Sequence, residues 1–305
     1  MSPSKPSSVF YKLLSLLSVV RGYNVLVLIV AQYFAALFIF SPNRSLRVII
    51  FDYKLFFIVF ASVFVVSAGY IINNFYDVKA DKINRPIKAS LDQVVSQKTK
   101  HQIYFLFNFL GFLLSWFISW KAALFFSAYI FAIWLYSHKL KRHPFIGLIS
   151  AAVLTITPFF AIFIYYKNFS KIIFVHATFL FFILLLRQLI KDLENLRGAV
   201  ANNYSTFPVA YGERKTRKLG ILFIFSTFAP AYVLVKYPAV GYMKYYFLVS
   251  IIVLVFIGYF LWRSNLKRHY VLLHNILKLM LLAGILSLLF IDPSILVERV
   301  IDKLN

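Results

Sequence analysis

The sequence predicts an all-α, polytopic membrane protein. Hydrophobic residues make up 61% of its 305 residues, and the mean hydropathy is +0.79. A soluble domain does not tolerate that much apolar surface. Apolar runs of about 17–23 residues recur along the chain, and each is long enough to cross a bilayer as a helix. We therefore expect nine transmembrane helices.

The nine apolar runs follow one another with short polar connections, and only a few residues separate the third from the fourth. Because they fill the chain, residues 1–305 are expected to form one transmembrane domain with a short polar N-terminal tail at about residues 1–10. The expected spans are 24–41, 53–75, 102–120, 122–136, 145–166, 171–190, 219–236, 244–262 and 271–291.

The N-terminal residues and the absence of cysteine exclude several kinds of segment and site. Met1 to Ser8 is polar and lacks the apolar segment of a cleavable signal peptide. The chain has no cysteine, which excludes disulfides, thiolate metal sites and thiol catalysis.

The net charge of +23 is distributed unevenly across the expected membrane. Of the 33 Lys and Arg residues, 22 fall on the side of the N-terminus and 10 on the other, while Lys278 lies within the ninth helix. Positive charge accumulates on the cytoplasmic side of membrane proteins. We expect a protein of the bacterial inner (cell) membrane, with the N-terminus and the even-to-odd loops in the cytoplasm and no nucleic-acid partner.

The first polar motif, Asn73-x-x-x-Asp77-x-x-x-Asp81, follows the second apolar run. Residues four apart lie nearly on one face of a helix, so an amide and two carboxylates point the same way at the membrane edge. Mg²⁺ prefers such oxygen ligands together with substrate phosphates. The motif predicts a phosphorylated substrate at the membrane. Asp92 lies beyond the motif and is expected to contribute little to activity.

A second polar motif follows the sixth run, where Gln188, Asp192 and Asn195 share a helical face. Glu194 lies on the other flank, where Lys191 or Arg187 is its expected partner. Asp77 and Asp192 each end the second helix of a four-helix stretch, which suggests an internal duplication. The two motifs then face each other across a central cavity enclosed by the nine helices.

These residues resemble the UbiA superfamily of intramembrane prenyltransferases over nearly the whole chain. The first family motif, N-x-x-x-D-x-x-x-D, is intact, and Asn84-Arg85-Pro86 after it also matches. The second, D-x-x-D-x-x-x-D, reads Asp192, Asn195 and Ala199 here, so only its first carboxylate is present. The sequence around both motifs is similar to the branch that prenylates geranylgeranylglyceryl phosphate.

The resemblance implies Mg²⁺-dependent transfer of a prenyl group from an allylic prenyl diphosphate to a lipid-soluble acceptor of the glycerol phosphate type. It assigns catalytic roles and metal ligation to Asp77, Asp81 and Asp192, with Asn73 and Asn195 as further metal ligands. Arg21 and Asn24 are the expected acceptor ligands. The cations expected to bind the diphosphate beside Asn73 are Arg85, Lys88, Lys139, Lys141, Arg142 and Lys191.

Three alternatives remain at this point. An aromatic-acceptor prenyltransferase of quinone biosynthesis would use the same donor site. The missing carboxylates at positions 195 and 199 favour a weakened or non-catalytic relative that binds an isoprenoid. An ion-coupled transporter also carries intramembrane acids, but the acids here lie at the edge of the helices.

Overall fold

The computed structural model of this protein describes residues 9–42, 44–263 and 266–291. This part of the chain is helical and contains nine apolar helices long enough to cross a membrane, which confirms the predicted fold class. These spans are Gly22–Phe40, Tyr53–Tyr76, Gln97–Ile118, Trp120–Arg142, Pro144–Tyr166, Lys171–Glu194, Phe207–Lys236, Pro238–Arg263 and Lys267–Phe290.

Several helices extend past their apolar runs because capping residues stabilise the polar first turns. The third begins at Gln97, five residues before its expected start, where the Ser96 hydroxyl accepts from Thr99 N at 3.1 Å. The seventh begins at Phe207 but contains a break at Gly212, whose φ of 79° suits glycine. The helical labels are α2 (Gly22–Ala35), α4 (Tyr53–Tyr76), α7 (Gln97–Ile118), α8 (Trp120–His138), α9 (Pro144–Tyr166), α10 (Lys171–Glu194), α12 (Phe207–Lys236), α13 (Lys244–Arg263) and α14 (Lys267–Ser287).

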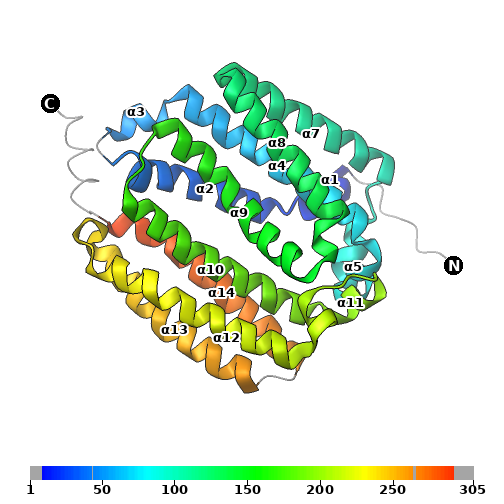
Figure 1. The fold of residues 1–305 in the computed structure, drawn as a ribbon. Helices are drawn as coiled ribbons and strands as arrows, with labels where there is room; N and C mark the ends of the chain where they lie inside the picture. Colours follow the sequence, from blue (N-terminus) through cyan, green and yellow to red (C-terminus); the bar gives the residue numbers. More distant parts are fainter. Residues whose placement is uncertain (1–8, 43, 264–265, 292–305) are drawn as a thin grey trace.

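Short helices complete the chain at both ends of the bundle. α3 (Leu46–Ile50) lies at one end. α5 (Val78–Asn84), α6 (Pro86–Asp92) and α11 (Leu196–Ala201) lie at the other, in the connections that carry the two polar motifs (Figure 1).

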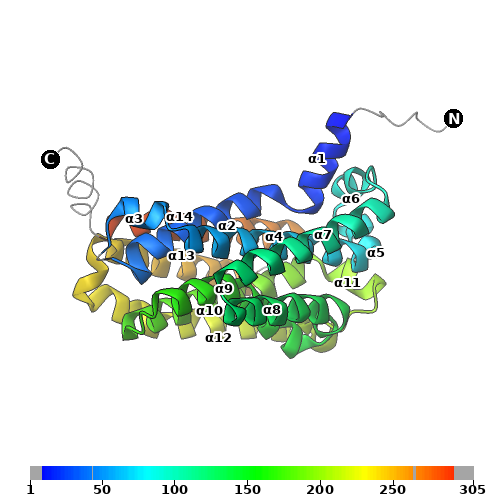
Figure 2. The ribbon, with the colours of Figure 1, turned by 90° about the horizontal axis from the view of Figure 1, so that it is seen from above.

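An N-terminal helix, α1 (Val9–Val19), was not expected from the sequence. The predicted polar tail at about 1–10 lies mainly outside the described residues. α1 projects from the bundle beside α6 (Figure 2). It contacts α6 through Ser15 Oγ, which donates to Leu91 O at 2.8 Å.

The long helices are arranged as a closed ring around a central space, and not as an open row. α2 contacts α4, α9 and α14, while α10 contacts α9, α12 and α14. The chain therefore closes on itself, and its first and last spans lie next to each other (Figure 1). This arrangement creates the expected central cavity.

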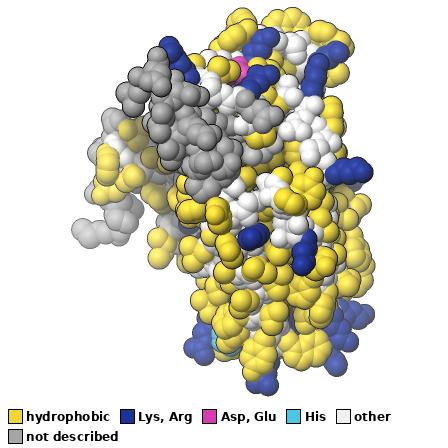
Figure 3. Space-filling model, turned by 90° about the vertical axis from the view of Figure 1, so that its left-hand side faces the viewer, with side chains coloured by type: hydrophobic (Ala, Val, Ile, Leu, Met, Phe, Trp, Pro, Cys, Tyr) yellow, Lys and Arg dark blue, Asp and Glu magenta, His cyan; other side chains and the backbone are white. Residues whose placement is uncertain are grey.

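Figure 3 views the end of the bundle that is remote from α5 and α11. Hydrophobic side chains dominate this face and are interrupted by scattered Lys and Arg. Many large apolar side chains on the sides of the bundle are also exposed, such as Phe105, Leu124 and Ile252. Such a surface is stable in lipid and not in water.

Candidate active site

Two cavities with shared lining residues lie inside the bundle. The smaller, of about 110 Å³, reaches α5 and α11 and is lined mainly by polar residues. The larger, of about 530 Å³, is mostly apolar and extends along the helices. The residues that line both cavities are Arg21, Asp77, Tyr136, Lys141, Gln188 and Lys191.

The polar residues of the first motif are held by neighbours from other helices. Asn73 Oδ1 accepts hydrogen bonds from Ser137 Oγ at 2.9 Å and Lys141 Nζ at 3.3 Å. The same Lys141 ammonium lies 2.7 Å from Asp77 Oδ1. Tyr204 OH also donates to Asp77 Oδ1, at 3.0 Å. Asp77 is thus fixed by a cation and a phenol at the mouth of the cavity.

The second motif faces the smaller cavity from the opposite wall. Gln188 Nε2 donates to Asp192 Oδ1 at 2.8 Å, which fixes that carboxylate. The Asn195 side-chain nitrogen donates to Lys191 O at 2.9 Å, so its carbonyl oxygen is the atom that can bind a cation. Asp77, Asp192 and Asn195 line one cavity, as expected from their positions in the sequence.

The same backbone unit carries both motifs. α4 ends at Asp77 with φ −97° and ψ 7°, and α10 ends at Asn195 with φ −101° and ψ 14°. The short helices that follow pack closely, because Asn84 Nδ2 donates to Asn195 O at 3.2 Å and Gly198 N donates to Asn84 Oδ1 at 3.3 Å. A Cβ at Gly198 would lie 2.1 Å from Asn84 Nδ2, so glycine is required there.

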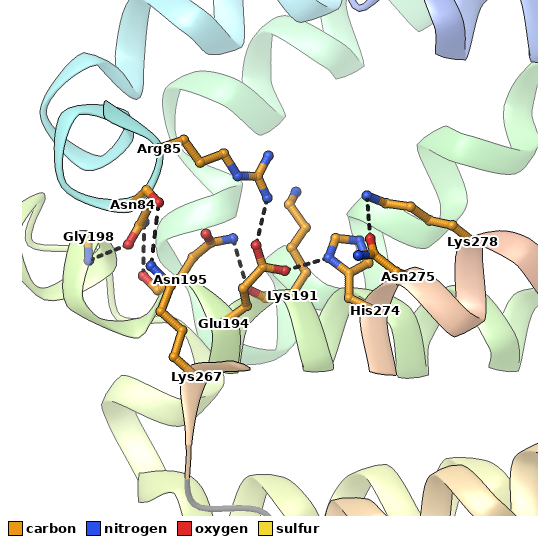
Figure 4. A network of polar contacts seen from close by, with 10 residues as sticks. All are labelled: Asn84, Arg85, Lys191, Glu194, Asn195, Gly198, Lys267, His274, Asn275 and Lys278. Atoms are coloured by element: carbon orange, nitrogen blue, oxygen red, sulfur yellow. Dashed lines mark hydrogen bonds and ion pairs between the residues drawn. The ribbon is translucent and has the colours of Figure 1, made fainter. Parts of the chain in front are cut away.

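Glu194 corrects one expectation from the sequence. Its carboxylate does not pair with Lys191 or Arg187. Arg85 Nη2 lies 3.0 Å from Glu194 Oε1, and His274 Nδ1 lies 2.6 Å from Oε2 (Figure 4). The turn between α5 and α6 brings Arg85 over the end of α10, a contact between distant parts of the chain that helical spacing does not reveal.

The structure brings most of the predicted site residues to the cavities. Asp81, Arg85, Asn195 and the position-199 alanine line the smaller one, and Asn24 and Asn73 line the larger one. Arg21 and Lys191 line both. Arg21 lies between α1 and α2 in a left-handed backbone conformation, with a φ of 53°. Its guanidinium lies 4.9 Å from the centre of the Tyr70 ring.

Three predicted diphosphate ligands line neither cavity. Lys88 forms an ion pair with Asp92, four residues later in the chain. Lys139 and Arg142 are exposed, and the Arg142 guanidinium lies over the outer side of the site at 5.9 Å from the centre of the Tyr204 ring. Of this basic cluster only Lys141 is buried, because the short 3-10 helix after α8 turns it inward.

Asp92 has a structural position that the sequence did not indicate. It is only 2% exposed. Its Oδ1 accepts from Ser18 Oγ at 2.6 Å, and its Oδ2 accepts from Asn74 Nδ2 at 2.9 Å. The buried Lys100 ammonium donates to Asn74 Oδ1 at 3.0 Å. Asp92 therefore joins α1, α4, α6 and α7 beside the site.

The sequence missed several residues at the site. Tyr136 lines both cavities, and Tyr204 contacts Asp77 directly. Arg187 and Lys278 line the larger cavity from α10 and α14. Lys278 and Arg187 both lie inside expected membrane spans, and this position could have indicated a role because a charge there is costly.

Two groups outside the membrane spans have shifted pKa values. Burial raises the pKa of the Asp81 carboxyl, and the nearby Asp77 carboxylate raises it further. Burial, the Asp77 charge and the hydrogen bond to it raise the pKa of the Tyr204 phenol. Both shifts have burial as their main cause, and the Asp77 carboxylate adds to each of them.

The donor set fits a divalent ion that completes its coordination with a substrate. Among the described residues no three His, Cys, Asp or Glu side chains form a closed metal cage. The carboxylates of Asp77, Asp81 and Asp192 instead line one small cavity with the Asn195 amide. Mg²⁺ is held in this way, by a few carboxylates together with substrate phosphates.

A helical bundle with carboxylates and cations at the head of a long apolar cavity defines an intramembrane enzyme for amphiphilic, phosphorylated substrates. The model of the UbiA prenyltransferase family matches residues 29–282. The chain belongs to this family, and it is an integral membrane prenyltransferase.

Relatives and solved structures agree with this assignment. The chain is 29% identical over 249 residues to the digeranylgeranylglyceryl phosphate synthase of Methanobrevibacter smithii, covering 78% of this chain and 83% of that protein. It is 30% identical over 185 residues to the synthase of Pyrococcus horikoshii, covering 60% of this chain and 66% of the relative, just under two thirds of its length.

Two solved structures share the fold. A digeranylgeranylglyceryl phosphate synthase has a TM-score of 0.68 at 19% identity, covering 91% of this chain and 97% of that one. A UbiA homologue from Archaeoglobus fulgidus bound to GPP and Mg²⁺ has a TM-score of 0.66 at 15% identity, covering 90% of this chain and 99% of that one.

Proposed function

We propose that this protein transfers a prenyl group from an allylic prenyl diphosphate to the hydroxyl of a glycerol phosphate lipid, with Mg²⁺ as the metal. The observation that carries the proposal is the convergence of Asp77 and Asp192, from α4 and α10, on the small cavity at the head of the apolar one. The family supplies the reaction class, and the named relatives supply the acceptor class.

The apolar cavity suits a prenyl tail in length. Its lining runs from Arg21 to Phe40 along α2 and its π-helical extension, and from Lys191 back to Ile173 along α10. At 1.5 Å per residue each stretch covers about 27 Å. A tail of four isoprene units, at about 1.2 Å per bond in an extended chain, is about 19 Å long.

Diphosphate departure is the step that the polar end favours. Mg²⁺ held by Asp77, Asp81 and Asp192 would offset the negative charge on the leaving diphosphate. Lys191 and Arg21 line the place where that charge develops and stabilise it at short range. Lys141 is paired with Asp77. A Mg²⁺ ion held by the Asp77 carboxylate would leave the Lys141 ammonium free to bind a phosphate oxygen.

The allylic carbon becomes electron-deficient as its C–O bond breaks. The Tyr136 ring lines the junction of the two cavities, and Tyr70 lines the larger one close to it. Aromatic faces attract cations and exclude water from this position. The acceptor hydroxyl forms the new ether C–O bond, and its proton leaves with the diphosphate.

The degenerate second motif supports one alternative function, that of a weakened or non-catalytic relative. Asn195 and Ala199 line the small cavity where carboxylates are expected. A weakened or non-catalytic isoprenoid-binding protein would bind a prenyl diphosphate without turnover. An aromatic-acceptor prenyltransferase would turn over the donor with a phenolic substrate instead.

We also propose that the site opens to the cytoplasm and that the protein lies in the cell membrane. The connections that carry α5, α6 and α11 are rich in Lys and Arg, as cytoplasmic loops are.

A direct assay separates these functions. Purified protein is incubated with geranylgeranyl diphosphate, Mg²⁺ and either geranylgeranylglyceryl phosphate or a phenolic acceptor, and products are identified by mass spectrometry. We expect an ether lipid phosphate, no product after EDTA treatment, and about 100-fold less product or lower still from Asp77→Asn. A prenylated phenol as the main product would contradict the proposed acceptor, and binding without turnover would contradict catalysis.

A further inference from the structure

Four cations lie along one side of the larger cavity, and two of them do not reach the small one. Arg21 and Lys191 line both cavities, whereas Arg187 and Lys278 line the larger cavity alone. Among the described residues, none of the four has a carboxylate within ion-pairing distance. The ion pairs described are Arg85–Glu194, Lys88–Asp92, Lys141–Asp77 and His274–Glu194.

Arg187 and Lys278 are both placed where a charge is expensive. Arg187 lies seven residues before the end of α10, and Lys278 lies eleven residues into α14. At 1.5 Å per residue these positions are about 10 and 16 Å from the helix ends. A cation at such depth in a membrane protein requires a partner or faces a polar cavity.

The protein does not supply that partner. Arg187 Nε is buried and makes no hydrogen bond within the described part of the chain. The contact described for the Lys278 ammonium is a long one to Asn275 Oδ1, at 3.4 Å. The nearby Glu194 carboxylate is already occupied by Arg85 and His274. Figure 4 shows the polar contacts around Glu194. In this view Lys191, from α10, and Lys278, from α14, extend to the same side of Glu194 as Arg85.

We infer that Arg187 and Lys278, with Arg21 between them and the smaller cavity, form a second anion site for a phosphate monoester. This inference rests on the proposed function and gives the acceptor phosphate its place. Arg187 and Lys278 match the nearly two negative charges of a phosphate monoester, and Arg21, which lines both cavities, is shared with the donor site. A donor diphosphate at Asp77 and Asp192 leaves this second site free, because Arg187 and Lys278 do not line the smaller cavity.

The two anion sites also explain how the substrates are kept apart. The donor site combines carboxylates with cations, so it selects an anion that brings a metal. The second site offers cations alone, so it selects an anion that needs none. A phenolic acceptor has no group for the second site, so Arg187 and Lys278 would remain unpaired inside the bundle even with the donor bound.

The test compares acceptors with and without the phosphate. Lys278→Gln is the main variant, because this side chain is exposed and glutamine removes the charge while keeping a polar side chain of similar length. Arg268→Gln is the matched control, since it removes the same charge from an exposed position on the same helix. Initial rates are measured with geranylgeranylglyceryl phosphate and with the corresponding dephosphorylated glycerol ether.

We expect Lys278→Gln to raise the KM for the phosphorylated acceptor about tenfold, which corresponds to 1.4 kcal/mol. The KM for geranylgeranyl diphosphate and the rate with the dephosphorylated acceptor should not change, and Arg268→Gln should behave as the native protein. Arg187→Lys should show a smaller change than Arg187→Gln, because it retains the charge but loses the fork of N–H donors.

Binding gives a readout that is independent of turnover. Isothermal titration of the detergent-solubilised protein with glycerol 1-phosphate should give a saturable signal that Lys278→Gln weakens. An equal loss with both acceptors, or an unchanged KM for the phosphorylated one, would overturn the second anion site while leaving prenyl transfer intact. Loss of all transfer by the native protein, with phosphate binding preserved, would instead refute the proposed function.

Discussion

Asp77 and Asn195 occupy equivalent positions in two copies of one backbone unit. Each ends a long membrane helix with nearly the same dihedral angles, and each is followed by a short helix that lines the smaller cavity. Four residues further on, the first copy has Asp81 and the second has Ala199. The two halves of the site therefore differ in charge while sharing a backbone.

This relationship predicts the effect of restoring carboxylates to the second copy. Asn195→Asp combined with Ala199→Asp adds two carboxylates to the lining of the cavity that also contains Asp77 and Asp81. We expect the Mg²⁺ concentration for half-maximal activity to fall about tenfold, a change typical of one improved contact at a metal site. The measurement is a Mg²⁺ titration of initial rates. A native protein without activity that the double change revives would support the weakened alternative.

The first motif predicts a larger loss. Asp77→Asn or Asp81→Asn removes one carboxylate with little change in shape, and we expect kcat/KM to fall by about 100-fold or more. Asp52→Asn is the matched control, because Asp52 caps the opposite end of α4 and bonds Tyr165 at 2.8 Å, away from the cavities. Equal losses at positions 52 and 77 would show that the effect is one of folding.

The ion pair between Arg85 and Glu194 predicts a change in stability. Glu194→Gln leaves the Arg85 and His274 side chains without their anion. Because the Arg85 side chain is 31% exposed, water screens part of the loss, and we expect a decrease of about 1–3 kcal/mol in the free energy of unfolding. Thermal unfolding in detergent measures it.

A double change provides the check on this pair. Arg85→Gln combined with Glu194→Gln removes both charges, so it should be less destabilising than the sum of the single changes. Strict additivity would mean that the two side chains do not interact in the folded protein.

Much of the fold could be predicted from the sequence, because hydropathy alone identifies helices that are surrounded by lipid. All nine predicted spans overlap the observed ones. α1 was missed because its eleven residues are too short to span a membrane. Its position depends on contacts of Ser15 and Ser18 with α6, which no local pattern reveals.

The site was predictable where a helix fixes spacing and unpredictable where the chain turns. Asp77 and Asp192 converge as expected, since each ends a helix that faces the centre. Lys88 lies seven residues after the first motif, and Arg142 follows Lys141 directly, but neither residue lines a cavity. Arg187 and Lys278 reach it from helices that pack side by side only in the folded bundle.

The contacts of Asp92 predict that this buried carboxylate helps to hold α1 in place, beside the hydrogen bond from Ser15 to Leu91. Ser18→Ala removes the tie between α1 and Asp92, whereas Ser90→Ala removes only a hydrogen bond within α6 and serves as the control. The chain has no cysteine, so spin labels at Lys12→Cys and Ile87→Cys report the distance between α1 and α6 without background. We expect double electron–electron resonance between the two labels to give a narrow distance distribution, and we expect Ser18→Ala to broaden it.

The control variant Ser90→Ala has its own expected result. Ser90→Ala should leave the distribution unchanged. A distribution that is already broad in the otherwise native protein would show that α1 is not docked on α6.

The central claim is that two segments 115 residues apart form one site for a metal and a diphosphate. Its most direct test is equilibrium binding of Mn²⁺, followed by electron paramagnetic resonance, in the presence of a non-cleavable thiolo analogue of geranylgeranyl diphosphate. We predict that Asp77→Asn and Asp192→Asn each abolish the analogue-dependent Mn²⁺ signal of the native protein. Retention of the native signal in Asp192→Asn would contradict a shared site.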